Sequence, residues 1–112
     1  MKRIEAIIRT GKVSDVSAAL KKVGYSGMMI SEIDGHGNQK GIEEQVRGKT
    51  YKVELMTKAR LEVIVKADDV PKIVKAVIDA AHTEKIGDGK IFVHPVEDVI
   101  RIRTGERGHV AI

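Results

Sequence analysis

The hydrophobic pattern changes its period in a fixed order along the chain, and that order limits the folds the chain can adopt. Residues 2–9 alternate apolar and charged side chains, which predicts a strand with one buried face. The apolar residues of 13–23 recur at helical spacing, and Gly24 then marks the end of a helix. Residues 26–34 predict a second strand. The first part of the chain is therefore expected to form strand, helix, strand.

The second part is expected to repeat this order. Residues 60–66 alternate again, and residues 70–81 place apolar side chains along one side of a helix. Asp68 and Asp69 are expected to cap that helix, and Pro71 suits its first turn. Two short strands are predicted to close the chain, at residues 90–94 and 99–103.

This order predicts an α+β fold of the ferredoxin-like βαββαβ type, in which an antiparallel sheet carries both helices on one face. A chain of 112 residues is long enough for one hydrophobic core, so residues 1–112 are expected to form a single domain. Ile7 and Ile64 lie on the otherwise polar side of their strands, so the second face of the sheet needs a cover. A homo-oligomer interface would supply one.

A long polar segment separates the second and third strands. Residues 35–57 keep no apolar period, and structureless loops longer than about 12–15 residues are uncommon in compact domains unless they have a function. We expect an exposed loop at about residues 37–56, in which Val53, Leu55 and Met56 could extend the flanking strand as a stem. Two interpretations remain open: a tolerated insertion, or a mobile contact arm that responds to a ligand at its base.

Composition excludes several classes of site. The chain has no cysteine, which excludes disulfides, thiolate zinc sites and cysteine nucleophiles. Its four histidines show no metal-ligand spacing, so we expect no histidine metal site. The net charge of +4 fits an anionic ligand. Because no long apolar span or leader pattern is present, the sequence predicts a cytoplasmic protein without direct membrane insertion.

Three segments of the chain favour anions. Residues 87–90 place Asp88 between two glycines and follow them with a lysine. Glycines allow positive φ and close approach of a ligand, and a lysine after such a turn can contact an anion held by backbone N–H groups. A second glycine cluster spans residues 35–41, and Arg101 and Arg103 form a pair near the C-terminus. Residues 87–90 alone could be a plain turn, but the three segments together predict a phosphorylated ligand.

Neither glycine cluster matches a standard nucleotide motif. Residues 87–90 lack the upstream glycine and the trailing Ser or Thr of a P-loop, so a P-loop NTPase is disfavoured. No Ser-His-Asp or paired-carboxylate arrangement is evident, and we expect neither an enzyme nor a catalytic cofactor. Nucleic-acid recognition by base stacking is also disfavoured, because the predicted strands offer only Phe92 as an aromatic platform.

With these motifs the chain resembles the PII nitrogen-regulatory signal-transduction proteins. The resemblance covers essentially the whole chain, is most specific from Thr83 to Val93 and is poorest at the loop tip. It implies a ferredoxin-like homotrimer with ATP/ADP sites in the clefts between subunits. The matching runs are Gly35-His-Gly-Asn-Gln-Lys-Gly41, Lys58-x-x-x-Glu62, Thr83-x-x-x-Gly-Asp-Gly-Lys-Ile-Phe-Val93 and Arg101-Ile-Arg-Thr-Gly-Glu106.

The resemblance also implies which residues hold the nucleotide. The second glycine turn and its lysine would wrap the phosphates, and the arginine pair would reach them from the neighbouring subunit. The first glycine cluster would line the other wall, and two residues of the third predicted strand would lie near the adenine and ribose. The implied nucleotide-binding residues are Gly35, Gly37, Asn38, Gln39, Glu62, Ile64, Gly87, Asp88, Gly89, Lys90, Arg101 and Arg103.

A second ligand is implied at the same place. Gln39 would bind Mg²⁺ beside the ATP phosphates, and 2-oxoglutarate would complete the coordination of the metal. Lys58 would then contact a carboxylate of 2-oxoglutarate. The implied 2-oxoglutarate-binding residues are Gln39, Lys40, Gly41, Lys58 and Gly87.

In this family the long loop inserts into targets, which implies an ammonium transporter or a nitrogen-metabolism enzyme or regulator as the partner. The contact residue would be Arg47, and a transporter would recruit the protein to the inner face of the membrane. Tyr51 matches the tyrosine that some bacterial members uridylylate, although an unmodified loop tyrosine is equally expected here.

The sequence departs from the family pattern near the nucleotide. Asn38 stands where an arginine is common, and Met29 stands where a small hydroxyl residue is usual. The leading hypothesis is a sensor of ATP/ADP and 2-oxoglutarate that controls partners through its loop. Two alternatives remain open: a trimeric interaction module with weakened nucleotide sensing, and a slow ATP hydrolase.

Overall fold

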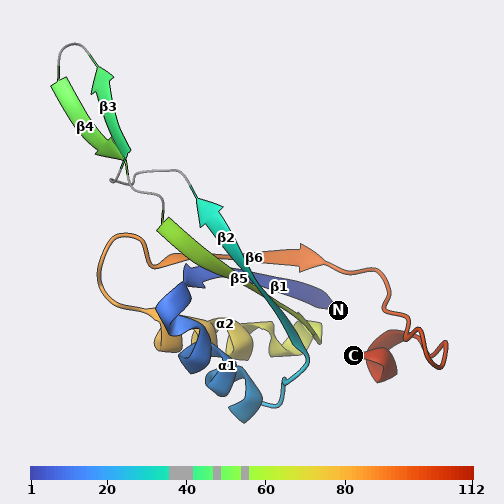
Figure 1. Ribbon diagram of the computed structural model, residues 1–112. Coiled ribbons are helices and arrows are strands. Elements are labelled where there is room, and N and C mark those ends of the chain that lie inside the picture. Colours follow the sequence, from blue (N-terminus) through green and yellow to red (C-terminus); the bar gives the residue numbers. More distant parts are fainter. Residues whose placement is uncertain (36–41, 47–48, 54–55) are drawn as a thin grey trace.

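The computed structural model describes residues 1–35, 42–46, 49–53 and 56–112 and contains one four-stranded antiparallel sheet (Figure 1). The strand order is β2-β5-β1-β6, so β1 lies between two neighbours and β2 and β6 form the edges. This topology confirms the predicted ferredoxin-like arrangement. The strands are β1 (Lys2–Arg9), β2 (Met28–Gly35), β5 (Met56–Val65) and β6 (Gly89–Pro95).

The two helices, α1 (Val13–Lys22) and α2 (Val70–Ala81), cover the same face of the sheet, as predicted (Figure 1). Each helix buries one apolar side against the inward side chains of the strands. In the described parts of the chain, no helix has the length and apolar character needed to cross a bilayer. The buried core is entirely aliphatic and consists of Ile4, Ala6, Ile8, Val16, Leu20, Ala59, Leu61, Val63, Val65, Ile73, Val77 and Ala81.

The strand register divides the sheet into a helix-covered face and an open face. Ala6 of β1 lies opposite Leu61 of β5, and both side chains are fully buried. Because side chains alternate along a strand, the intervening residues point to the open face. Ile7, Ile64 and Phe92 are among them, and none of the three is buried. The prediction that apolar side chains lie on an uncovered face of this chain is therefore confirmed.

A separate hairpin interrupts the long segment between β2 and β5. Its strands are β3 (Ile42–Val46) and β4 (Lys49–Val53), which pair antiparallel from Ile42 opposite Val53 to Val46 opposite Lys49. Figure 1 shows the hairpin beyond the end of the sheet where β2 stops and β5 begins. The sequence pattern did not predict these strands, because each has five residues and too few apolar side chains to show a sustained alternation.

The expected capping of α2 by aspartate side chains is wrong. Asp68 and Asp69 belong to a short 3-10 turn, Ala67–Asp69, that leads into the helix, and no side chain caps the first helical N–H groups. Asp69 has αR dihedrals instead of the extended conformation typical of a capping residue. Its carboxylate accepts a hydrogen bond from the hydroxyl of Tyr25 and lies 3.5 Å from Lys72 Nζ. Pro71 does lie in the first turn.

The strand predicted at residues 99–103 is also wrong. This segment forms a single bridge, Ile100 opposite Arg107, and then turns. The Arg101 amide donates to the carbonyl of Glu106 at 2.8 Å, so partners within the segment satisfy the backbone in place of a sheet neighbour. The chain ends in a short 3-10 helix, Gly108–Ala111. Ile102 remains fully exposed at the tip of the turn.

Replacing Leu61 by alanine tests the core. Leu61 is fully buried in β5, so we expect Leu61→Ala to lower the free energy of unfolding by about 2–5 kcal/mol, because the side chain leaves a cavity. Urea unfolding at a fixed protein concentration measures this change. Ile86→Ala is the matched control, because Ile86 is 96% exposed and should change the stability by less than about 0.5 kcal/mol. Equal losses in the two variants would contradict the assignment of the core.

Candidate functional site

The connection from α2 to β6 forms a turn at one end of the sheet. Gly87 and Gly89 have φ values of +103° and +107°, in the left-handed region that favours glycine. A Cβ atom at Gly89 would lie 1.7 Å from the carbonyl oxygen of Ile7 in β1. The turn therefore requires glycine at position 89 both for its backbone conformation and for its close packing on the sheet. We call residues 83–90 the glycine turn.

The Asp88 side chain accepts hydrogen bonds from within the glycine turn. One carboxylate oxygen, Oδ2, accepts a hydrogen bond from the Thr83 amide at 2.8 Å, and Oδ1 accepts another from the Thr83 hydroxyl. Arg9 Nε lies 3.1 Å from Oδ1. The hydrogen bonds from Thr83, followed by the charge of Arg9, hold the pKa of this carboxyl far below its usual range. Asp88 therefore remains ionised and faces groups of the protein.

Lys58 approaches the same turn from β5. Among the side chains that the structure describes, Lys58 is the one charged group that is buried, and its ammonium donates to the Gly87 carbonyl. Burial lowers the pKa of Lys58, the nearby Arg9 charge lowers it further, and Asp88 acts in the opposite direction. Lys58 lies opposite Arg9 in the sheet register. Two adjacent cations thus share one carboxylate.

Arg9 was not among the residues predicted to form the site. It ends β1 and makes two contacts with the glycine turn, one with Asp88 and one from Nη2 to the Ile86 carbonyl at 2.8 Å. The sequence offered one indication, since Arg9 lies on the charged face of its strand. It offered no indication of which distant segment that face would meet.

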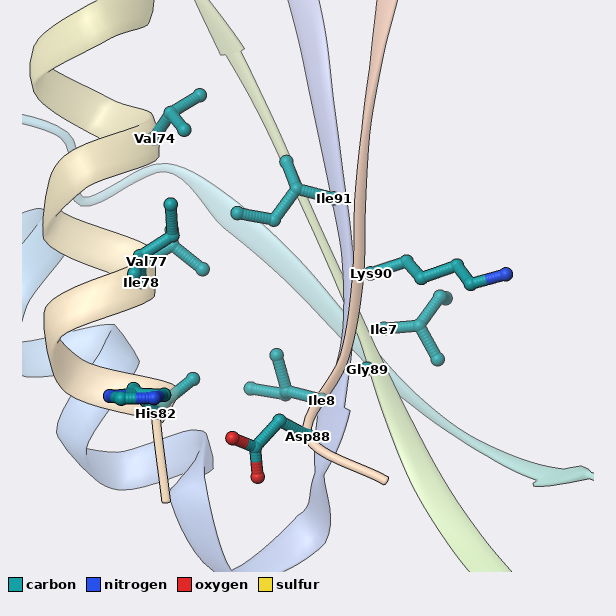
Figure 2. A pocket seen from close by; sticks show the side chains of 11 residues that line it. Ile7, Ile8, Val74, Val77, Ile78, His82, Asp88, Gly89, Lys90 and Ile91 are labelled. Carbon is teal, nitrogen blue, oxygen red and sulfur yellow. The ribbon is translucent and has the colours of Figure 1, made fainter. Parts of the chain in front are cut away.

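An apolar pocket of about 310 Å³ adjoins the glycine turn, between α2 and the start of β6 (Figure 2). Val77, Ile78 and Ile91 are among the residues that line it. Figure 2 shows the Asp88 side chain on the α2 side of β6, whereas the Lys90 and Ile7 side chains extend from the opposite side. The Lys90 ammonium is therefore exposed on the open face of the sheet and is directed away from the pocket.

The remaining predicted residues of β2 and β5 lie along the sheet. Gly35 ends β2 opposite Met56, at the root of the hairpin. Glu62 and Ile64 are on the open face of β5. In the sheet register, Ala59 of β5 lies opposite Ile8 of β1, and Ile64 follows Ala59 by five positions. Because a strand rises about 3.3 Å per residue, Ile64 is separated from the level of the glycine turn by roughly 17 Å. A single chain does not bring these residues together.

Several predicted residues lie outside the described residues. These are Gly37, Asn38, Gln39, Lys40, Gly41 and Arg47. Tyr51 lies in β4, where its backbone is opposite Glu44.

The C-terminal segment, which contains the predicted arginine pair, lies at the far end of the sheet from the glycine turn (Figure 1). Arg101 is held within the C-terminal segment, where its guanidinium donates to Glu106 Oε1 and to the Val110 carbonyl, each at 2.8 Å. Arg103 is exposed. One chain thus presents two separate anion-favouring regions, the glycine turn and the C-terminal arginines. Within the described ranges, no group of three His, Cys, Asp or Glu residues is placed to hold a metal ion.

Replacing Gly89 by alanine tests the glycine turn. The new methyl group would be forced against the Ile7 carbonyl at an unfavourable φ, so we expect Gly89→Ala to lower the free energy of unfolding by more than about 2 kcal/mol. Chemical denaturation measures the change. Gly11→Ala is the control, because nothing lies within 4 Å of a Cβ at that position. A Gly89→Ala protein as stable as Gly11→Ala would disprove the close approach.

The lowered pKa of Asp88 predicts a dependence of stability on acid. Because this pKa is lower in the folded chain than in the unfolded chain, ionised Asp88 stabilises the fold above the ordinary carboxyl value of about 4. That stabilisation should disappear as the pH falls from about 4 toward the folded-state value. We expect Asp88→Asn to lose this part of the acid dependence, measured as melting temperature between about pH 7 and pH 2.

Thr83→Val provides the intermediate case, because it removes the hydroxyl donor to Asp88 and keeps the amide donor. Its acid dependence should lie between those of the wild type and Asp88→Asn. If all three proteins melt in parallel at every pH, the Asp88 contacts do not contribute to the stability of the fold.

Comparison with known proteins identifies the family. The family model described as "Nitrogen regulatory protein P-II" matches residues 1–106. A nitrogen regulatory protein P-II of Azospirillum brasilense is 49% identical over the full length of both chains. Nitrogen regulatory protein P-II 1 of Methanothermobacter thermautotrophicus is 48% identical over all of this chain and 97% of that protein.

A solved structure agrees with the sequence comparison. The crystal structure of Arabidopsis thaliana PII bound to citrate is 40% identical to this chain and superposes with a TM-score of 0.81. The superposition covers 99% of this chain and 91% of that one. The likeness therefore includes the sheet, both helices and the glycine turn. This chain belongs to the nitrogen regulatory protein P-II family and is a regulatory protein, not an enzyme.

Proposed function

We propose that this chain senses ATP and ADP together with 2-oxoglutarate and controls partner proteins through residues 42–53, the β3–β4 arm. The observation that carries the proposal is the convergence of cations on the glycine turn. Lys58 and Arg9 contact the turn from two strands, and Lys90 is its last residue. Backbone amides in a glycine-rich turn with nearby cations are a typical site for phosphate.

The charge balance around the turn supports an anionic ligand. Arg9 and Lys58 are in contact with the turn, and Asp88 is the carboxylate they share. Burial of Lys58 raises the energy of its charged form, and a bound anion would compensate for that cost. A triphosphate together with a dicarboxylate needs a metal and several cations, whereas ADP needs fewer. ATP with Mg²⁺ and 2-oxoglutarate would therefore engage more of the cations at this site than ADP would.

The separation of the two anion-favouring regions supports a site shared between copies of the chain. Strand β6 runs seven residues from Gly89 to Pro95, about 23 Å, before the C-terminal segment with Arg101 and Arg103 begins. In a homotrimer, the arginines of one copy would complete the glycine turn of the next. The same assembly would cover Ile7 and Ile64 on the open face. Glu62 and Ile64 would then approach the nucleotide of a neighbouring copy.

The second ligand would engage Lys58. In this structure the Lys58 ammonium donates to the Gly87 carbonyl, and we propose that it transfers to a carboxylate of 2-oxoglutarate. The Arabidopsis thaliana relative is described as bound to citrate, a small molecule whose charges are carboxylates, and this supports a carboxylate ligand here. Gln39 would bind Mg²⁺, with Lys40 and Gly41 beside it.

The position of Lys58 would connect ligand binding to the β3–β4 arm. Met56, where β5 begins, lies opposite Gly35, where β2 ends, and Lys58 follows two residues later. The Thr10 hydroxyl also donates to the Thr57 carbonyl at 3.0 Å. A ligand on Lys58 would therefore act at the root of the arm. Such a ligand shifts the equilibrium between arm conformations only by the difference in its affinity for them.

The proposed target is an ammonium transporter or a nitrogen-assimilation enzyme or regulator, contacted through Arg47. Binding to a transporter would bring a cytoplasmic protein to the inner face of the membrane. Tyr51 in β4 is the proposed modification site on the arm.

Isothermal titration calorimetry tests the sensing function. We expect wild-type protein to bind ATP, and to bind 2-oxoglutarate only when Mg-ATP is present. Lys90→Ala should weaken ATP binding by roughly 10–100-fold, because it removes a charge-assisted contact with phosphate. Lys75→Ala is the matched control, since Lys75 is an exposed lysine of α2 that pairs with Asp79 at 2.7 Å.

Two outcomes would contradict the proposal. Equal binding of 2-oxoglutarate with and without nucleotide would rule out the shared site. Unchanged ATP affinity in Lys90→Ala would favour a trimeric interaction module without effective nucleotide sensing. Steady-state release of phosphate, measured in the same samples, separates sensing from slow ATP hydrolysis.

A further inference from the structure

We propose that Arg9 is a positioning residue for the anion site: it orients the glycine turn so that backbone N–H groups face the ligand, and it neutralises the carboxylate within that turn. The inference rests on the proposed nucleotide function and concerns a residue that the sequence did not predict as part of the site. Arg9 ends β1, whereas its two contacts lie in the connection between α2 and β6.

The two contacts of Arg9 come from one planar group. Nε lies 3.1 Å from Asp88 Oδ1, and Nη2 donates to the Ile86 carbonyl at 2.8 Å. A guanidinium presents its donors in a fixed fork, so a fixed guanidinium sets the relative position of the two groups it contacts. A lysine at this position would keep the charge but would lack the fork.

The Ile86 contact determines where the next amide points. In a trans peptide the carbonyl and the following N–H belong to one plane and point in opposite directions. Arg9 holds the Ile86 carbonyl, and Lys58 holds the Gly87 carbonyl. The N–H groups of Gly87 and Asp88 are therefore turned away from these two cations. Two consecutive amides become available to an anion on the outer side of the turn.

The contact between Arg9 and Asp88 reduces the repulsion that the Asp88 carboxylate would exert on a bound phosphate. A carboxylate between two phosphate-binding glycines would repel a phosphate, because like charges at short range destabilise each other. Here the carboxylate accepts two hydrogen bonds from Thr83 and one from Arg9, which also supplies a positive charge. The turn thus keeps the hydrogen bonds that Asp88 provides while Arg9 offsets its charge.

Hydrogen exchange of the ligand-free full chain tests the orientation. We expect Arg9→Ala to speed amide exchange in residues 84–90 by about tenfold or more, with α2 unchanged, because a local opening becomes easier. Arg9→Lys should fall between Arg9→Ala and wild type. Lys75→Ala, which removes an ion pair of α2, serves as the control and should leave the turn unchanged.

Nucleotide titration tests the electrostatic part. We expect Arg9→Ala to weaken ATP binding by about tenfold, and the double variant Arg9→Ala/Asp88→Asn to recover part of that loss. A purely structural role would not predict this recovery, because the second substitution removes further contacts with Thr83 and restores none. Only the removal of an uncompensated negative charge would improve binding.

The outcomes separate this inference from the proposed function. If exchange of residues 84–90 is the same in Arg9→Ala, Arg9→Lys and wild type, the inference is overturned. If Arg9→Ala speeds amide exchange throughout the chain, the Arg9→Lys variant becomes the deciding measurement. For the inference to stand, Arg9→Lys must then show faster exchange that is confined to the glycine turn. If wild type binds no ATP while the turn alone loosens in the variants, the proposed function fails and the effect of Arg9 on the turn stands.

Discussion

The structure depends on strand β1, one of the two inner strands of the sheet. β5 and β6 bond to its two edges, and its inward residues Ile4, Ala6 and Ile8 are buried under the helices. Burial of a large aliphatic side chain such as Ile4 contributes about 1.5–3 kcal/mol. The same strand ends at Arg9, so the element that organises the core also places a cation at the glycine turn.

The glycine turn combines a local requirement with a tertiary one. Gly87 and Gly89 supply the positive φ values that the chain needs in order to reverse closely beside β1. Arg9 and Lys58 then fix the two carbonyls of the turn from neighbouring positions of the sheet. The glycines make the conformation accessible, and the two basic side chains select one orientation of its peptide groups.

If the proposed function holds, the distance between the glycine turn and the arginine pair leaves one chain incomplete as a nucleotide site. The two regions lie at opposite ends of β6, and the C-terminal segment satisfies its backbone through its own contacts, such as Arg101 with Glu106. In the proposed trimer, assembly and ligand binding are linked, because each site takes residues from two copies. The open face of the sheet and the exposed Ile102 fit a chain that is covered by other copies.

Much of the fold could be predicted from the sequence, because the buried elements carry strong periodic patterns. β1, α1, α2 and the core part of β5 each alternate or repeat at the spacing of their structure. The β3–β4 hairpin could not be found in this way, since each of its strands has five residues and too few apolar side chains to show a sustained alternation. Residues 99–103 resemble a strand because Ile100 and Ile102 alternate with arginines, yet among the described residues their one bridge is between Ile100 and Arg107.

For the site, the sequence by itself determined the glycine turn, since Gly-Asp-Gly-Lys defines both the backbone conformations that residues 87–90 can adopt and the charge that follows them. Those properties are local, and local patterns are readable from a single chain. Only the tertiary structure decided that Arg9, Lys58 and Thr83 meet Asp88 and the carbonyls of the turn. Contacts between residues as distant in sequence as Arg9 and Asp88 depend on strand register, which is set by burial of the helix-covered face of the sheet.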